Sequence, residues 1–102
     1  MKIELDMHTH TIASGHAFST LQEMAKAGAE KGLKLLGITE HTSGIPGTCE
    51  PIYFRNLHVV PRQMYGIELM LGAEINILDS HGNIDADEEL MRRLDIRIAG
   101  IH

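Results

Sequence analysis

The chain has 102 residues, which suffices for one small domain and excludes two domains of ordinary size. Its apolar content of 43% and charged content of 23% are typical of a globular protein, and no apolar run approaches the roughly 18 residues of a membrane span. Nine basic against fourteen acidic residues give a formal charge of −5, with no basic stripe for a nucleic-acid backbone. We therefore expect neither a nucleic acid nor a membrane as a partner.

The amino-terminal segment and the cysteine content indicate the compartment. MKIELDMHTH has neither the apolar core nor the small-residue cleavage site of a signal peptide. Cys49 is the single cysteine and cannot form an internal disulfide, which favours a reducing compartment. The sequence thus predicts a cytoplasmic protein.

The first predicted strand comes from the alternation of apolar and polar residues between Ile3 and His8. This alternation places His8 and His10 on one face. After a polar stretch at residues 9–19, the sequence predicts a helix.

The start and end of this helix are both marked in the sequence. Ser19 and Thr20 are candidate caps, because Gln22 and Glu23 follow them at the spacing of a capping box. Gly32 is a typical residue just past a helix end. We therefore expect the helix to end just before Gly32.

The central part of the chain mixes clear and ambiguous signals. The apolar run at 33–39 predicts a strand buried on both faces, and the turn-rich segment 42–50 predicts a functional loop. Residues 52–66 are ambiguous because Pro61 interrupts any continuous helix, and we expect two short helical pieces around it.

A third strand is predicted at 67–77 and is followed by a turn at 79–83. Asp85 or Asp87 is then expected to cap a short helix that ends at Arg93.

The run LDIRIAGI, residues 94–101, predicts a fourth strand. Alternation of strands and helices is typical of right-handed crossovers between parallel strands, and each such unit needs roughly 30 residues. The expected fold class is therefore α/β with a parallel sheet.

Residues of metal-ligand type recur once in each of these units. His10, His41, Glu74 and His102 stand at the ends of the predicted strands, with spacings of 31, 33 and 28 residues. The carboxyl ends of parallel strands meet at one edge of a sheet, where sites are built. Imidazole and carboxylate ligands suit zinc, iron or manganese. The spacing therefore predicts a metal site.

Spacing alone does not show whether the remaining histidines bind metal. His8 either chelates an ion together with His10 or forms a satisfied pair in a turn, and His16 either reaches the same face or lies in solvent. His58 and His81 fall in the ambiguous segment and in a turn, so we expect both to be exposed and not to bind metal.

Four motifs together resemble the PHP domain, named for polymerase and histidinol phosphatase, and most closely its small bacterial phosphatase branch. These motifs are DMHTH followed by His16, TEH ending at His41, GAE ending at Glu74, and IAGIH ending at His102. The similarity extends over all 102 residues and includes SGHAFSTL, Pro61-Arg62 and GNID. It implies that 1–102 is the N-terminal portion of a single PHP domain. The implied fold is a half-barrel, the first four β/α strands of a distorted (β/α)7 TIM-like barrel.

The resemblance also implies a centre of up to three divalent metal ions, zinc in most relatives, with manganese or iron also compatible with the ligand types. His8, His10 and Glu74 would hold one ion, Glu74 would bridge to a second ion that also takes His102, and His16 and His41 would hold the third. The family pattern names three later ligands, two histidines and an aspartate, that this sequence does not contain.

The implied function is a metal-dependent phosphoesterase that hydrolyses the monoester of a small phosphorylated substrate through a metal-bridging hydroxide. Arg62 is the first candidate for a phosphate contact and Arg55 the second, although such arginines more often form surface ion pairs. One alternative is an amidohydrolase-like metallohydrolase, whose pattern lacks the Glu74-type bridge and the loop histidine, His16. Another is a non-catalytic metal-binding or self-assembling fragment. Since an open sheet exposes two edges, a homo-oligomer in which partner chains complete the barrel is a further expectation.

Overall fold

A computed structural model describes residues 2–101 and places four parallel strands in one sheet, with helical segments between them. None of the helices within these residues has the length and apolar character that a membrane crossing requires. The elements, with η denoting short 3-10 helices, are β1 (Leu5–Thr9), η1 (Ile12–Ser14), α1 (Leu21–Glu30), β2 (Leu35–His41), α2 (Pro51–Arg55), η2 (Asn56–Val59), β3 (Gln63–Met64), β4 (Ile67–Asn76), α3 (Glu88–Arg92) and β5 (Arg97–Gly100).

The sheet follows the order of the chain. β2 lies between β1 and β4 and pairs in parallel with both. The other edge of β4 is shared, because its beginning pairs antiparallel with β3 and its residues 73–76 pair in parallel with β5. Neighbouring parallel strands in chain order, joined through helices, are the arrangement of a TIM-like barrel wall. The expected α/β half-barrel is therefore confirmed.

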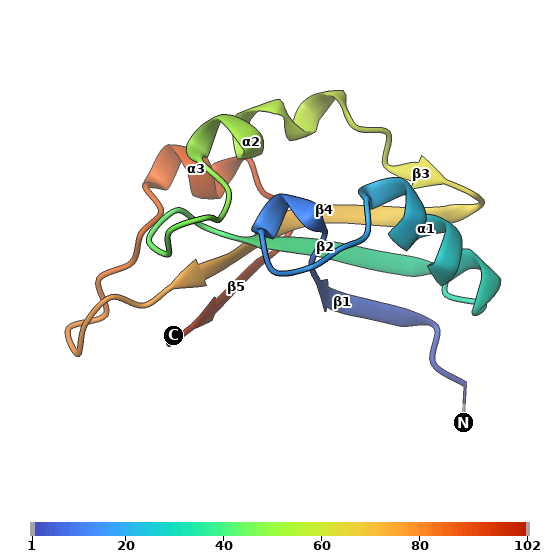
Figure 1. Cartoon of the computed structure of the whole chain (residues 1–102), viewed down its shortest axis with the longest axis horizontal. Helices are drawn as coiled ribbons and strands as arrows, with labels where there is room; N and C mark the ends of the chain where they lie inside the picture. The colour runs from blue at the N-terminus through green and yellow to red at the C-terminus, as the bar shows by residue number, and fades with distance from the viewer. Residues whose placement is uncertain (1, 102) are drawn as a thin grey trace.

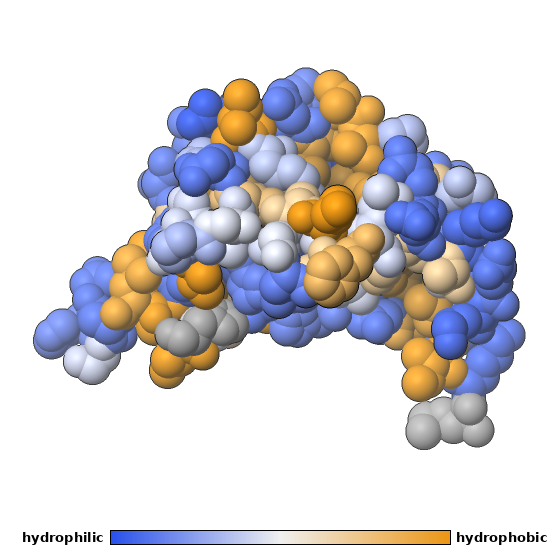
Figure 2. All heavy atoms as spheres, viewed as in Figure 1, coloured by the Kyte–Doolittle hydropathy of each residue, from blue (hydrophilic) through white to orange (hydrophobic). Residues whose placement is uncertain are grey.

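Two glycines explain how strongly this sheet is curved. At Gly37 of β2 a Cβ atom would lie 2.8 Å from the backbone of Met7, and at Gly72 of β4 it would overlap the carbonyl oxygen of Ile96. The backbones before β5 and within β1 therefore pass directly over these positions. Figure 1 shows β1 and β5 on the side of the sheet away from α1, α2 and α3, and Figure 2 shows the resulting arch, hollow on that side, with apolar atoms near both of its ends.

β1 contains a bulge between Asp6 and Thr9, the stretch that includes His8. Asp6 pairs with Leu36 and Thr9 with Ile38, so three steps along β1 oppose two steps along β2. The strict alternation expected from Ile3 onward is therefore interrupted. An extra residue in one strand bends it and redirects the side chains that follow, which is common next to functional sites.

Helix α1 has the expected start and end. Of the two candidate caps the structure uses Thr20, whose hydroxyl accepts from the Glu23 N–H at 3.2 Å while the Glu23 carboxylate accepts from the Thr20 N–H at 2.8 Å. Gly32 follows the C-cap with a φ of 83°, a conformation that glycine adopts without strain. The helix covers the sheet and helps to enclose the apolar core, whose most buried large side chains are Phe54, Ile38, Leu69 and Leu71.

The prediction of helical pieces on both sides of Pro61 was wrong for the segment that follows Pro61. Both helical pieces, α2 and η2, precede Pro61, and the segment after it forms the short antiparallel strand β3. Tyr65 and Gly66 have φ angles of 54° and 83°, which are typical of the tight turn that joins two antiparallel strands. This turn stands where the second helical piece was predicted, and it places Met64 opposite Ile67 in the antiparallel pair.

The turn at 79–83 forms as expected, with the Asp79 carboxylate accepting from the N–H groups of His81 and Asn83. Asp87, rather than Asp85, caps the following helix and accepts from the Leu90 N–H at 2.8 Å. The last strand is shorter than expected, since it begins at Arg97.

Candidate metal centre

Five side chains of metal-ligand type converge at the carboxyl ends of the strands. They come from β1 and the turn after it, from the end of β2 and from β4, and they form two groups that share His10. Within each group the candidate ligand atoms all lie within 4.8 Å of one another. The groups are His8, His10 and Glu74, and His10, His16 and His41.

The first group is built around one carboxylate oxygen. Glu74 Oε1 lies 2.7 Å from His8 Nε2 and 2.9 Å from His10 Nε2. Glu74 is buried, while His8 is half-exposed. Burial alone would raise the pKa of the Glu74 carboxyl, but the hydrogen bond from His8 and the charges of His41, His8 and His10 together lower it. Glu74 is therefore an anion at neutral pH and can act as a ligand or bridge.

The second group has the spacing of ligands on one ion. His41 Nε2 and His16 Nε2 are 3.3 Å apart. Two nitrogens at zinc–nitrogen distances of about 2.0–2.1 Å in a tetrahedral site are separated by about 3.3–3.4 Å. The ring of His10 stacks on that of His41 with centroids 4.5 Å apart and an angle of 6° between planes. The donor set thus fits a small divalent cation.

His10 is the residue that joins the two groups. Burial lowers the pKa of its imidazole and is the largest influence; the charges of His16 and His8 lower it further, so the net pKa is lowered although the carboxylates of Glu74 and Glu40 raise it. A lowered pKa keeps the ring neutral at neutral pH, which is the form that binds metal.

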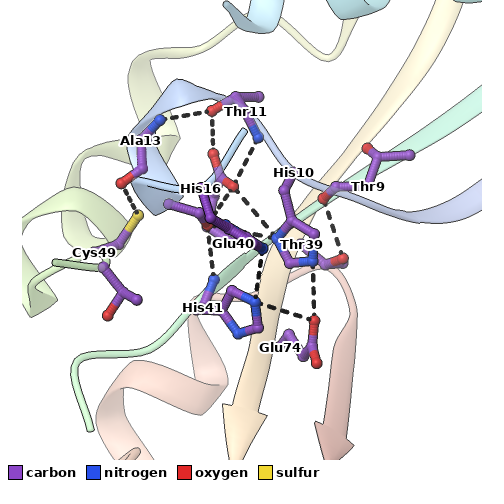
Figure 3. A network of polar contacts seen from close by, with 12 residues as sticks. Thr9, His10, Thr11, Ala13, His16, Thr39, Glu40, His41, Cys49 and Glu74 are labelled. Atoms are coloured by element: carbon purple, nitrogen blue, oxygen red, sulfur yellow. Dashed lines mark hydrogen bonds and ion pairs between the residues drawn. The ribbon is translucent and has the colours of Figure 1, made fainter. Parts of the chain in front are cut away.

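The buried carboxylate of Glu40 forms hydrogen bonds with the turn that carries these imidazoles. The sequence patterns did not single it out as part of the site. Its side chain is fully buried and accepts from the Thr11 N–H at 2.9 Å, from the Thr11 hydroxyl and from the Ser14 hydroxyl at 2.7 Å. Figure 3 shows Glu40 hydrogen-bonded to Thr11, with His10 and His41 nearby. Ser14 Oγ also accepts from the His41 N–H at 3.1 Å and lies 3.4 Å from His10 Nδ1. Glu40 therefore fixes the turn that carries the histidines.

A signal for Glu40 was present in the strand pattern. Leu36, Ile38 and Glu40 alternate along β2, so all three share the face that packs into the core. A carboxylate in a series of buried apolar positions needs hydrogen-bond donors around it. Thr11 and Ser14, in the polar stretch after the first strand, provide them.

The loop after β2 is held by a second carboxylate. Asp85 accepts from the Thr42 hydroxyl at 2.5 Å, from the Gly44 N–H at 2.7 Å, and from the backbone and side-chain nitrogens of Asn76 at 2.8 and 2.6 Å. Burial raises the pKa of Asp85, but these hydrogen bonds more than offset it and lower the pKa below its ordinary value. Asp85 thus connects the residue after His41 to the end of β4.

The two candidate arginines lie elsewhere. Arg62 Nε donates to Asp95 at 2.7 Å, and its Nη1 donates to the carbonyl oxygens of Leu57 and Val60 at 2.8 and 2.9 Å. Arg55 is exposed on α2. The Arg62 side chain therefore joins η2 and Val60 to the segment before β5, and the structure brings neither arginine into the histidine groups.

The remaining sequence candidates are also accounted for. His58 and His81 are both exposed and belong to neither group. Burial raises the pKa of the Cys49 thiol to about 12, and its Sγ donates to the Ala13 carbonyl, so the thiol stays protonated. His102 lies outside the described residues.

The comparisons with known proteins agree with this architecture. Residues 6–95 match the PHP domain family. The chain is 47% identical over 102 residues to a probable phosphatase of Thermoanaerobacter sp. (strain X514), 49% identical to one of Clostridium novyi (strain NT) and 43% identical to one of Clostridium acetobutylicum. Each match covers 100% of this chain and 42% of the relative, so the chain spans less than half the length of these curated relatives. The chain belongs to the PHP domain family.

Proposed function

We propose that this chain forms part of a metal-dependent phosphatase that hydrolyses phosphate monoesters in the cytoplasm. The observation that carries the proposal is the convergence of four imidazoles and one carboxylate into two groups that share His10. The names of the relatives support the same reaction class.

The two groups would each supply ligands to a cation. Glu74 supplies negative charge between His8 and His10, and His16 and His41 face each other at ligand spacing. Divalent cations bound here would polarise the phosphoryl oxygens and lower the pKa of water to near neutrality. The surrounding chain is acidic overall, with a formal charge of −5, so the cations would also supply the positive charge that attracts a phosphate.

Zinc is the metal that we propose. Mixed imidazole and carboxylate sites can bind zinc, iron or manganese, but imidazole suits zinc and iron better, whereas manganese and magnesium prefer oxygen ligands. Four imidazoles against one carboxylate in the two groups therefore favour zinc, with iron as the next choice.

A turnover assay tests the proposal. The chain, loaded in parallel with zinc, iron or manganese, is given p-nitrophenyl phosphate as a generic monoester. We expect hydrolysis with zinc, loss of hydrolysis in His10→Ala, and unchanged hydrolysis in His58→Ala, since His58 belongs to neither group. Equal rates in the two variants would contradict the assignment of the site.

A second candidate function is metal binding without catalysis. Each group offers three side chains from the described residues, which suffices for binding an ion but leaves its further ligands undefined. Stoichiometric zinc with no turnover of the monoester would favour this function. An amidohydrolase-like reaction is less well supported, because its pattern lacks Glu74 and His16, both of which lie in the groups.

A further inference from the structure

A pocket of about 330 Å³ opens beside the second histidine group. It is lined by His16 and His41 together with the loop after β2, which contributes Ile45, Pro46 and Thr48. Ser14 at the end of η1, Gly15 after it, and Gly47 complete the lining. We call this space the loop pocket. Its volume is at the small end of the range for ligand sites, about the size for a single ring.

The loop pocket offers few polar groups to a ligand. No lysine, arginine, aspartate or glutamate is among its lining residues. Its two hydroxyl groups are directed into the protein: Ser14 donates to Glu40 at 2.7 Å, and Thr48 donates to the carbonyl oxygens of Thr42 and Ile45 at 2.8 and 2.6 Å. A charged or polyhydroxylated group placed here would lose its hydrogen bonds to water without replacement.

The walls of the loop pocket are fixed before any ligand binds. A Cβ atom on Gly15 would overlap the carbonyl oxygen of Gly47, so the two loops touch through their backbones. The Gly44 N–H is held by Asp85 at 2.7 Å, and the Cys49 N–H donates to the His41 carbonyl at 3.2 Å. A preformed pocket loses little conformational entropy when it is filled.

We propose that the loop pocket receives the organic part of the phosphate monoester and selects a small, uncharged and largely apolar group, such as a phenyl ring. This inference rests on the proposed phosphatase function. Its carriers are the apolar side chains of Ile45 and Pro46 and the contact of the pocket with His16 and His41, where the phosphate would lie beside the cations.

The test measures binding, which does not require turnover. Inorganic phosphate, phenyl phosphate and 4-carboxyphenyl phosphate are titrated calorimetrically into the zinc-loaded chain. We expect phenyl phosphate to bind about tenfold or more tightly than inorganic phosphate, because the ring is buried. The carboxyl group should remove this gain, leaving affinity within about threefold of inorganic phosphate.

Two matched substitutions locate the effect. Ile45→Asp should weaken phenyl phosphate about tenfold and leave inorganic phosphate within about twofold, because the substitution changes only the pocket wall. Val59→Asp adds the same charge on η2, at a residue 70% exposed outside the pocket, and should change neither affinity.

The outcomes separate the two proposals. Equal affinities of the three compounds for the unsubstituted chain would overturn the selection that we infer while leaving the phosphatase proposal intact, and this comparison does not depend on any variant folding. Failure of all three compounds to bind the zinc-loaded chain would contradict the phosphatase proposal and, with it, the inference. Tighter binding of phenyl phosphate that Ile45→Asp removes would support both.

Discussion

Glu40 accepts a hydrogen bond from the hydroxyl of Ser14 at 2.7 Å inside a fully buried network, although neither residue belongs to a metal-ligand group. Ser14 Oγ in turn lies 3.4 Å from His10 Nδ1 and accepts from the His41 N–H at 3.1 Å. Contacts on Nδ1 leave Nε2 of His10 facing Glu74. A carboxylate that acts through a hydroxyl therefore helps to set the position of the shared imidazole.

Glu40→Gln should weaken zinc binding about 10–100-fold, because the amide nitrogen of glutamine cannot accept hydrogen bonds from Thr11 and Ser14. The measurement is a competition titration of zinc against a chelator. Glu50→Gln is the matched control, since Glu50 is exposed and its side chain makes no cap hydrogen bond. Equal zinc affinities of the two variants would show that the buried network does not position the ligands.

Gly72→Ala should destabilise the fold by about 3 kcal/mol, because the new Cβ would overlap the carbonyl oxygen of Ile96. Gly28→Ala adds the same methyl group on α1, where its nearest neighbours lie at 3.4 Å, an ordinary contact distance. In a helix this change should be neutral or stabilising by up to about 1 kcal/mol. The measurement is urea unfolding of both variants. Similar unfolding midpoints would contradict the close approach of the Ile96 carbonyl to Gly72.

Asp85→Asn should destabilise the chain by about 1–3 kcal/mol at neutral pH, because the amide cannot accept from all four donors around it. The effect should depend on pH. The folded-state pKa of Asp85 is lowered, so its ionisation stabilises the fold above the unfolded-state pKa of about 4 and this stabilisation is lost as the pH falls through the folded-state value. The free energies of unfolding of the two proteins should therefore converge below about pH 4.

Glu30 is an exposed carboxylate on α1, so Glu30→Gln is the control substitution for this pH series. The free energy of unfolding of Glu30→Gln should differ little from that of the unsubstituted chain at every pH. A constant difference between Asp85→Asn and the unsubstituted chain from pH 7 to pH 3 would argue against the lowered pKa.

The sequence was informative where one residue type recurs with the β/α period. His10 follows β1, His41 ends β2 and Glu74 lies two residues before the end of β4, and parallel pairing brings such positions to one edge. The spacing could not place His16, because the loop that carries it is positioned by hydrogen bonds from Thr11 and Ser14 to Glu40. These contacts join residues 26 to 29 positions apart in the chain.

Local backbone conformation also determined the structure of a segment that the sequence pattern left ambiguous. Residues 52–66 were misassigned because the turn at Tyr65 and Gly66 needs positive φ angles, which a scan for helical pieces around Pro61 does not consider. The ion-pair partner of Arg62 could not be identified from the sequence either, since Asp95 lies 33 residues further along the chain.

The two side-chain groups joined by His10 are expected to bind metal ions. This binding can be measured by elemental analysis of the purified, zinc-equilibrated chain by plasma mass spectrometry, alongside His10→Ala, His16→Ala and His58→Ala. We predict at least two zinc ions per chain, loss from both groups in His10→Ala, loss from one group in His16→Ala, and full content in His58→Ala. Less than one zinc ion per chain, or the same zinc content in His10→Ala as in His58→Ala, would contradict metal binding by these two groups.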